Sequence, residues 1–219
     1  MCAFKVVRMS DPPPTAARSS PSTLRNRDPI LGVLRQFLPE TGLVLEIAAG
    51  AGEHAVHFAS ALTTLRWQPT DTDAEALASI DAWRQQACLI NLLPPLRLDS
   101  ADPETWPVTR ADAVVAINMI HISPWSATEG LFSGAARALP PGGALFLYGP
   151  FFERGFPAAP SNIEFDQSLK RRNSEWGIRR LDDLTVEGER HGLRLSERIA
   201  MPANNLVLVF RKSLSAAAA

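Results

Sequence analysis

The sequence predicts an α/β fold in which helices cover both faces of a mostly parallel sheet. Short apolar runs with the character of buried strands alternate with stretches whose apolar residues recur at helical spacing. Such alternation is typical of strands joined by crossover helices, which makes neighbouring strands parallel. The last two apolar runs, residues 193–200 and 205–212, have only a short connection, so we expect them to pair antiparallel.

Composition and length fit one soluble domain. The chain has 219 residues, of which 46% are hydrophobic and 21% charged. A net charge of −1 gives no indication of binding to nucleic acid or to an acidic membrane. Cys2 and Cys88 form neither a disulfide framework nor a metal motif. Because the sequence shows no membrane-spanning run and no secretory signal, we expect a cytoplasmic protein.

A single domain is expected over residues 23–212. Residues 1–22 are expected to be a flexible leader, because residues 9–23 are rich in Pro, Ser, Thr and Ala. Residues 213–219 end in four alanines and are expected to be a tail. Neither end is expected to carry chemistry.

The first half of the chain predicts an opening helix followed by alternating strands and helices. We expect the opening helix to begin near Asn26, because Asp28 and Pro29 are typical of helix starts. The elements expected after it are a strand at 43–47, a helix at 52–62, a strand at 65–71, a helix at 73–86 and a strand at 96–102.

The second half predicts the most buried strand, at 111–118, which is a continuous apolar run. The stretch 150–180 has mixed polarity and no clear period, and we expect it to cover the substrate. The other elements expected here are a helix at 125–139, a strand at 144–149, a helix at 181–191 and the two final strands.

The seven strands predict a Rossmann-like, doubly wound, mostly parallel sheet with a C-terminal antiparallel hairpin. This is the outline of the class I S-adenosylmethionine-dependent methyltransferases. Ligands of such sheets bind beyond the carboxyl ends of the strands, near the point where strand order reverses. Gly50 and Gly52 lie at the first such end, where their lack of side chains lets backbone approach a ligand.

Two cofactors fit this glycine turn. Residues 50–55 match the G-x-G-x-x-A form of the dinucleotide fingerprint, which is typical of NAD enzymes. Residues 46–52 fit the methyltransferase pattern of an acid followed by spaced glycines, with Ala48 in place of the first glycine. A carboxylate at Glu46 would repel a pyrophosphate, whereas it suits the ammonium and sulfonium groups of S-adenosylmethionine.

Acids at the next two strand ends favour the same cofactor. Asp71 follows the second strand, where a carboxylate can bind ribose hydroxyls, and Asp99 follows the third, where methyltransferases often bind adenine. Three acids on successive strand ends, without a basic clamp for phosphate, favour the methyl donor. Each acid has the alternative role of a helix cap or a solvated loop residue.

Seven separated stretches carry a family resemblance: 25–31, 45–59, 67–73, 116–125, 147–151, 161–179 and 201–212. Together they resemble the methyltransferase-like 26 family, a group of class I methyltransferase-like proteins, over roughly residues 22–212. The resemblance implies that fold and an S-adenosylmethionine cofactor, with S-adenosylhomocysteine as product, but no agreed substrate.

The resemblance also implies which residues hold the cofactor. The methionine half would lie on the residues from Glu46 to Gly52, the ribose on Asp71 and the adenine on Asp99. Arg25 and Asn26 would reach the cofactor carboxylate, with helix capping as the alternative. The full set is Arg25, Asn26, Glu46, Ala48, Gly50, Gly52, His54, Asp71, Thr72, Asp99, Asn118 and Met119, the last two facing the sulfonium.

Three residues are candidates for removing a proton or orienting the acceptor. His121 follows the fourth strand, at a position that faces the methyl group in many members of the fold, and imidazole can act as a general base. Its alternative is a hydrogen-bonded structural histidine. Tyr148 ends the fifth strand, and Asp166 lies in the cover, where pairing with Arg172 is the alternative.

The sequence therefore predicts a metal-free methyltransferase acting on a small molecule, because the sulfonium is an activated donor and positioning supplies much of the acceleration. We expect neither nucleic-acid nor membrane partners, and oligomeric state stays open. A non-catalytic cofactor-binding sensor or partner protein is the first alternative. An NAD-dependent oxidoreductase is the second.

Overall fold

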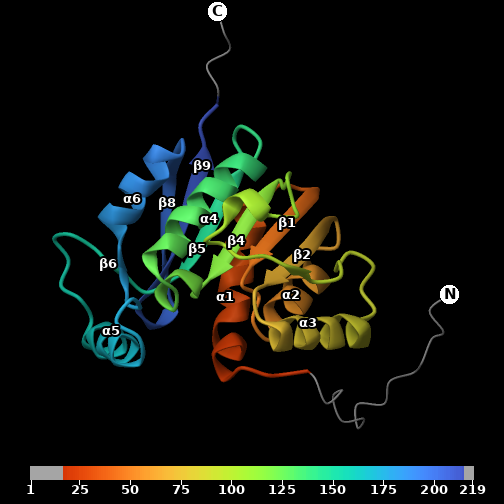
Figure 1. Ribbon diagram of the computed structural model, residues 1–219, viewed down its shortest axis with the longest axis horizontal. Helices are drawn as coiled ribbons and strands as arrows, with labels where there is room; N and C mark the ends of the chain where they lie inside the picture. Colours follow the sequence, from red (N-terminus) through yellow and green to blue (C-terminus); the bar gives the residue numbers. More distant parts are fainter. Residues whose placement is uncertain (1–16, 215–219) are drawn as a thin grey trace, which may run out of the picture.

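The computed structural model describes residues 17–214, in which a seven-stranded sheet lies between two layers of helices (Figure 1). The sheet strands are β1 (Gly42–Ile47), β2 (Leu65–Asp71), β3 (Leu96–Arg97), β4 (Ala113–Ile117), β5 (Ala144–Gly149), β8 (Leu193–Met201) and β9 (Asn205–Lys212). Their order is β3-β2-β1-β4-β5-β9-β8. Strands β1 to β5 are parallel, and β9 runs antiparallel to both β5 and β8, which confirms the predicted fold class.

Helices cover both faces of the sheet. They are α1 (Pro21–Phe37), α2 (Glu53–Ala61), α3 (Ala74–Ala87), α4 (Trp125–Ala138), α5 (Pro160–Arg172) and α6 (Leu181–Arg190). One core cluster joins α1 and α2 to the sheet, and there Phe58 packs on Trp67 with ring centroids 5.3 Å apart. A second cluster joins α4 and α6 to the opposite face, with Phe132 against Phe210 at 5.0 Å.

Burial on both faces explains why the central strands show no alternation in sequence. Every residue of β5 is buried, as are four of the five residues of β4. Side chains of a strand point alternately to the two faces, and here each face meets a helix layer. A continuous apolar run is the pattern that this environment selects.

The structure corrects the start of the first helix. Helix α1 begins at Pro21 rather than near Asn26, and Pro29 lies inside it. Proline suits a first helical position, so Pro21 was the better start signal. Long-range bonds hold the preceding segment, since Ser20 N–H donates to Glu53 Oε2 at 2.5 Å. Residues 17–22 of the expected leader thus belong to the part of the chain that the structure describes. Leader residues 1–16 and tail residues 215–219 lie outside the described residues.

The third strand is also shorter than predicted. Strand β3 covers Leu96–Arg97 only, instead of residues 96–102. The Asp99 carboxylate accepts a hydrogen bond from the N–H of Ala101 at 2.9 Å, a local turn that competes with strand pairing. Asp99 consequently lies in the loop beyond the strand.

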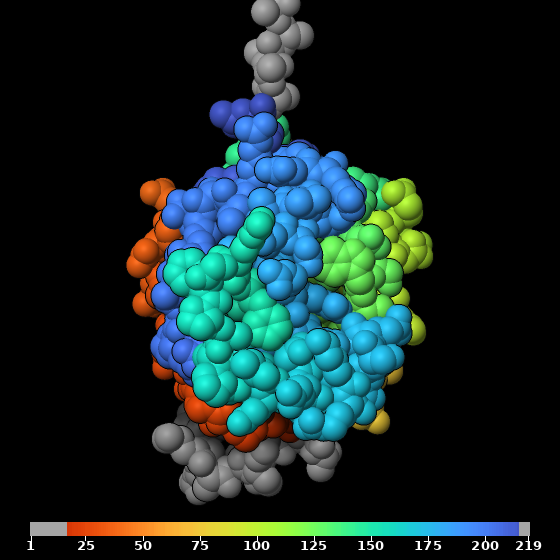
Figure 2. Space-filling model, turned by 90° about the vertical axis from the view of Figure 1, so that its left-hand side faces the viewer, coloured from red at the N-terminus to blue at the C-terminus, as the bar shows by residue number. Residues whose placement is uncertain are grey.

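The segment 150–180 contains a helix that the sequence analysis did not identify. It holds α5 and two short paired strands, β6 (Phe151–Phe152) and β7 (Arg179–Arg180). Figure 2 shows this segment spread over one side of the molecule. Asp166 Oδ1 accepts the N–H of Ile178 at 2.9 Å, and Arg179 Nε donates to the Ile120 carbonyl at 2.8 Å. The first bond holds α5 to the end of the segment, and the second fixes the segment to the turn after β4.

We expect Asp166→Ala to lower the free energy of unfolding by about 1–3 kcal/mol, because it leaves a buried N–H without an acceptor. Hydrogen exchange should show lost protection in residues 160–178 before the rest of the chain. Chemical denaturation provides the global measurement. Glu164→Ala, an exposed position on the same helix, is the control and should change stability by less than about 0.5 kcal/mol. Equal effects of the two changes would contradict the assigned anchor.

Candidate functional site

The turn after β1 is built from left-handed backbone conformations. Ala48 has φ 54°, Gly50 φ 58° and Gly52 φ 91°. Glycine adopts such angles freely, whereas alanine does so with a steric cost of roughly 1–2 kcal/mol. Ala48 therefore keeps the conformation expected of the glycine it replaces in the sequence pattern.

The N–H groups of this turn already have acceptors inside the protein. Gly50 N–H donates to Asp71 Oδ2 at 2.9 Å. Ala49 N–H donates to the Thr70 carbonyl at 2.8 Å, and Gly52 N–H to the Ala49 carbonyl at 3.1 Å. The turn consequently offers none of these three donors to a phosphate.

The two glycines of the turn differ in what surrounds them. A Cβ placed on Gly50 would meet no atom within 4 Å. A Cβ on Gly52 would lie 2.8 Å from the Cα of Ile80 in α3. Gly50 thus faces open space, where a ligand can approach the backbone, and Gly52 allows two helices to pack closely.

Glu46 lies below the turn, inside the protein. Its side chain is 1% exposed and accepts a hydrogen bond from the Trp67 indole N–H at 2.6 Å. Burial raises the pKa of Glu46 to about 8, and the nearby charge of Asp71 acts in the same direction. The carboxyl is therefore mostly protonated at neutral pH. Glu46 is thus a buried acid under the turn, and its expected contact with the methionine half of the cofactor stays a prediction.

Asp71 lies at the end of β2, with both carboxylate oxygens facing backbone. Besides Gly50, it accepts the N–H of Asp73 at 3.0 Å. Thr72 and Asp99 are exposed at the same edge of the sheet. Their roles toward ribose and adenine stay predictions.

The two residues after β4 point to different places. Asn118 has φ 58° and lines a cavity described below. Met119 is only 6% exposed and packs in the core cluster beneath α4, where Ser123 Oγ lies 3.5 Å from its sulfur. The short helical turn after Asn118 directs the Met119 side chain into the core, and its expected place against the sulfonium stays a prediction.

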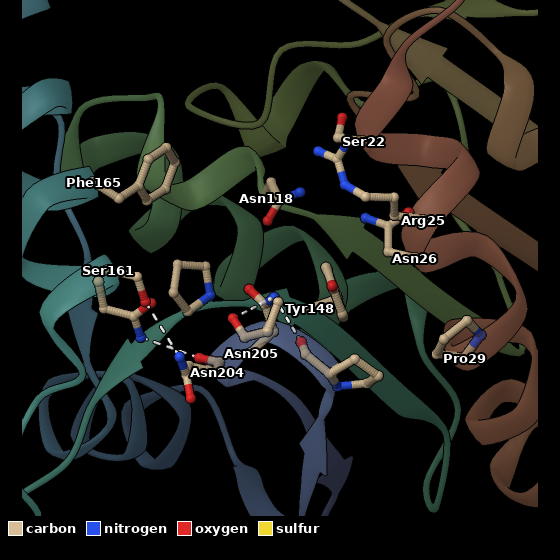
Figure 3. A pocket seen from close by; sticks show the side chains of 14 residues that line it. Ser22, Arg25, Asn26, Pro29, Asn118, Tyr148, Ser161, Phe165, Asn204 and Asn205 are labelled. Atoms are coloured by element: carbon tan, nitrogen blue, oxygen red, sulfur yellow. Dashed lines mark hydrogen bonds between the residues drawn. The ribbon is translucent and has the colours of Figure 1, made fainter.

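A cavity of about 790 Å³ opens beside Asn118, between α1, α5 and the ends of β4 and β5 (Figure 3). It is large enough for a drug-sized molecule. Its lining residues are Ser22, Arg25, Asn26, Pro29, Asn118, Tyr148, Pro150, Ser161, Asn162, Phe165, Pro202, Ala203, Asn204 and Asn205. Arg25, Asn26, Asn118 and Tyr148 were candidates from the sequence, whereas Asn204 and Asn205, in the turn between β8 and β9, were not.

Part of the cavity wall comes from the hairpin between β8 and β9, which sequence analysis could not place there. Asn162 Nδ2 donates to the Asn204 carbonyl at 3.1 Å, and Asn204 Nδ2 lies 3.2 Å from Ser161 Oγ. These bonds join the hairpin turn to the start of α5. The clue in the sequence is the Asn204–Asn205 pair, whose turn takes two positive φ angles, at Ala203 and Asn204.

A hydrogen bond behind the cavity supports one wall. His54 Nε2 lies 2.8 Å from Oδ1 of Asn26, a residue that lines the cavity together with Tyr148. Burial lowers the pKa of His54 to about 4, so its neutral ring can donate to the amide. Burial raises the pKa of Tyr148, so the phenol stays protonated at neutral pH. His54 therefore supports Asn26 rather than lining the cavity.

His121 is fully buried and lies outside the cavity lining. Neither ring nitrogen has a hydrogen-bond partner, and burial lowers the pKa of the ring to about 3. A Cβ on Gly149 would come within 2.3 Å of Nε2, so the ring occupies the space beside that glycine. The burial of the ring favours a structural role, and the role of His121 as a base stays a prediction.

Asp166 is a structural anchor in this conformation. One oxygen accepts the Ile178 N–H, and the other lies 2.7 Å from Lys170 Nζ. The sequence alternative of an Asp166–Arg172 pair is wrong, because Arg172 stacks over the Trp176 ring at 5.0 Å. Asp166 does not line the cavity, and its place among the catalytic candidates stays a prediction.

Within residues 17–214, no group of three or more His, Cys, Asp or Glu side chains is arranged to hold a metal ion. In the same residues, no helix is both long and apolar enough to cross a membrane.

Solved structures define the class of this fold. An O-methyltransferase family protein from Burkholderia thailandensis superposes with a TM-score of 0.75 at 15% identity, covering 89% of this chain and 58% of that one. The mitomycin 7-O-methyltransferase gives 0.74 at 16%, covering 88% and 54%. Human N-acetylserotonin methyltransferase, in complex with S-adenosylmethionine, gives 0.73 at 14%, covering 88% and 53%. The protein has the class I methyltransferase fold.

A family model matches residues 17–212. The chain belongs to this family, which is described as "Protein of unknown function (DUF938)". It spans between 53% and 58% of the length of the three solved chains. At these identities the likeness establishes the fold.

We expect Glu46→Gln to remove the part of the pH dependence of the unfolding free energy that comes from the Glu46 carboxyl. Between pH about 4.5 and 8 the unfolded chain loses the Glu46 proton while the folded protein keeps it, so raising the pH favours unfolding. The wild-type free energy of unfolding should fall by up to about 1.4 kcal/mol per pH unit in this range. Chemical denaturation at pH 5 and 8.5 should show the variant gaining stability only at the higher pH. Glu164→Gln, at an exposed site, should follow the wild type.

Proposed function

We propose that the protein is an S-adenosylmethionine-dependent methyltransferase that acts on a small-molecule acceptor and releases S-adenosylhomocysteine. The observation that carries the proposal is the hydrogen bond from Gly50 N–H to Asp71 Oδ2 at 2.9 Å. A turn that binds the pyrophosphate of NAD presents free N–H groups to it. Here a carboxylate takes that donor, which suits a cofactor without phosphate and opposes the oxidoreductase alternative.

The proposed cofactor site lies over the turn and the ends of the neighbouring strands. The open space at Gly50 admits the methionine half beside Ala48 and Gly52. Asp71, with Thr72 beside it, is proposed to bind the ribose, and Asp99 the adenine. When bound, S-adenosylmethionine supplies a methyl group on a positively charged sulfur. The structural neighbour from humans is in complex with this cofactor, which supports the choice.

The cavity is proposed to hold the acceptor. It lies beside Asn118, at the end of β4, next to the point where strand order reverses between β1 and β4. Tyr148 and Asn118 are held together by the backbone, because Asn118 N–H donates to the Tyr148 carbonyl at 2.8 Å. These two side chains are therefore proposed to orient the acceptor toward the cofactor. The narrower assignment to the methyltransferase-like 26 family stays a prediction from sequence motifs.

Calorimetry with S-adenosylhomocysteine and with NAD tests the cofactor. We expect binding of S-adenosylhomocysteine and no detectable binding of NAD. S-adenosylhomocysteine should raise the midpoint of thermal unfolding and NAD should not, because a ligand that binds only the folded state stabilises it. Binding of NAD alone would remove the methyltransferase proposal.

Two alanine substitutions distinguish a loss of cofactor binding from a loss of stability. Gly50→Ala puts a methyl group into the open space, so it should weaken S-adenosylhomocysteine binding at least about tenfold while costing only the backbone strain of roughly 1–2 kcal/mol. Gly52→Ala drives a methyl group against Ile80 and should destabilise the protein more than Gly50→Ala. Denaturation and calorimetry measure both. Unchanged cofactor affinity in folded Gly50→Ala protein would contradict the proposed site.

A further inference from the structure

The charged side chains that line the cavity are of one sign, positive. Among its fourteen lining residues, all within the described chain, Arg25 alone carries a charge, and Asp, Glu, His, Lys and Cys are missing from the lining. Figure 3 shows the Arg25 side chain extending from α1 toward the side where Asn118 lies. The remaining lining consists of Asn, Ser and Tyr side chains together with proline, alanine and phenylalanine.

The groups that usually remove protons stand outside this cavity or are already engaged. His121 is fully buried behind Gly149. His54 is bonded to Asn26, and Asp166 is bonded to Ile178 and Lys170. Tyr148 does line the cavity, but burial raises its pKa, so it is a poor base. Among residues 17–214, the cavity lining contains no group suited to deprotonate an acceptor held here.

We infer that the acceptor is a small organic anion, a carboxylate or an acidic phenol, whose attacking oxygen is ionised before it binds, and that Arg25 selects it. The inference rests on the proposed function and names its substrate class. A lone guanidinium facing neutral amides attracts an anion without competition from a nearby carboxylate. Phe165 and Pro150 also line the cavity and suit an apolar or aromatic body.

The reaction balances without a base. The ionised acceptor oxygen forms a bond to the methyl carbon as the carbon–sulfur bond breaks, and the electron pair of that bond stays on sulfur. One negative and one positive charge combine into two neutral products, and no proton is released. Because the acceptor's charge is already partly lost in the transition state, Arg25 favours the bound anion over the transition state. It should therefore act on substrate binding rather than on the chemical step.

The experiment is ligand binding to the protein saturated with S-adenosylhomocysteine. The probes are matched pairs: benzoate with benzamide, cinnamate with cinnamamide, and 4-nitrophenol with 4-nitroaniline. We expect at least one anion to bind, with its neutral partner at least about tenfold weaker, since a hydrogen bond to a charged group is worth that factor or more. Arg25→Gln should remove this preference. Arg35→Gln makes the same charge change at an exposed position of α1 outside the cavity lining and should retain it.

The outcomes distinguish this inference from the proposed function. Loss of anion preference in Arg25→Gln, with unchanged affinity for S-adenosylhomocysteine, supports it. If the cofactor product binds but no anion does, if neutral partners bind equally well, or if Arg25→Gln weakens only the cofactor product, the inference is overturned while the methyltransferase proposal stands. If S-adenosylhomocysteine itself fails to bind the wild-type protein, the proposed function fails. For any anion that is methylated, Arg25→Gln should raise KM without lowering kcat, because Arg25 stabilises the bound anion more than the transition state.

Discussion

The hydrogen bond between Gly50 N–H and Asp71 Oδ2 is the contact on which the candidate site depends. It ties the turn after β1 to the end of the neighbouring β2 at 2.9 Å. Because Asp71 also accepts the N–H of Asp73, the same carboxylate holds the start of the segment leading into α3. One side chain therefore fixes two loops at the edge of the sheet and withdraws a backbone donor from any phosphate.

Charge is distributed unevenly across this edge. Glu46 is buried under Trp67 and mostly protonated, so it contributes a hydrogen-bond acceptor to the core rather than a negative surface. On the proposed cofactor side, Asp99 is exposed, whereas Asp71 is buried and accepts two backbone N–H groups. Among the described residues that line the cavity beside Asn118, Arg25 is the one charged residue. A positively charged methyl donor would lie beside the acids of the proposed cofactor side, and an anionic acceptor would lie beside Arg25 in the cavity.

The segment between β5 and α6 completes the cavity and is held by polar contacts. Asp166 anchors α5 to Ile178, and Arg179 donates to the carbonyls of Ile120 and Ser123. These contacts attach the cover to the turn after β4, close to Asn118. The position of the cover, and with it the shape of the cavity, therefore depends on contacts with the turn after β4.

The sequence by itself determined the sheet, because apolar runs such as 111–118 and 144–149 and the glycine turn at 50–52 are local patterns that report burial and backbone angle directly. It also located Arg25, Asn26, Asn118 and Tyr148, which the structure brings to one cavity. Only the tertiary structure decided that Glu46, Met119, His121 and Asp166 face inward or are engaged elsewhere. Side-chain direction and hydrogen-bond partners depend on residues far apart in the chain, which no local pattern encodes.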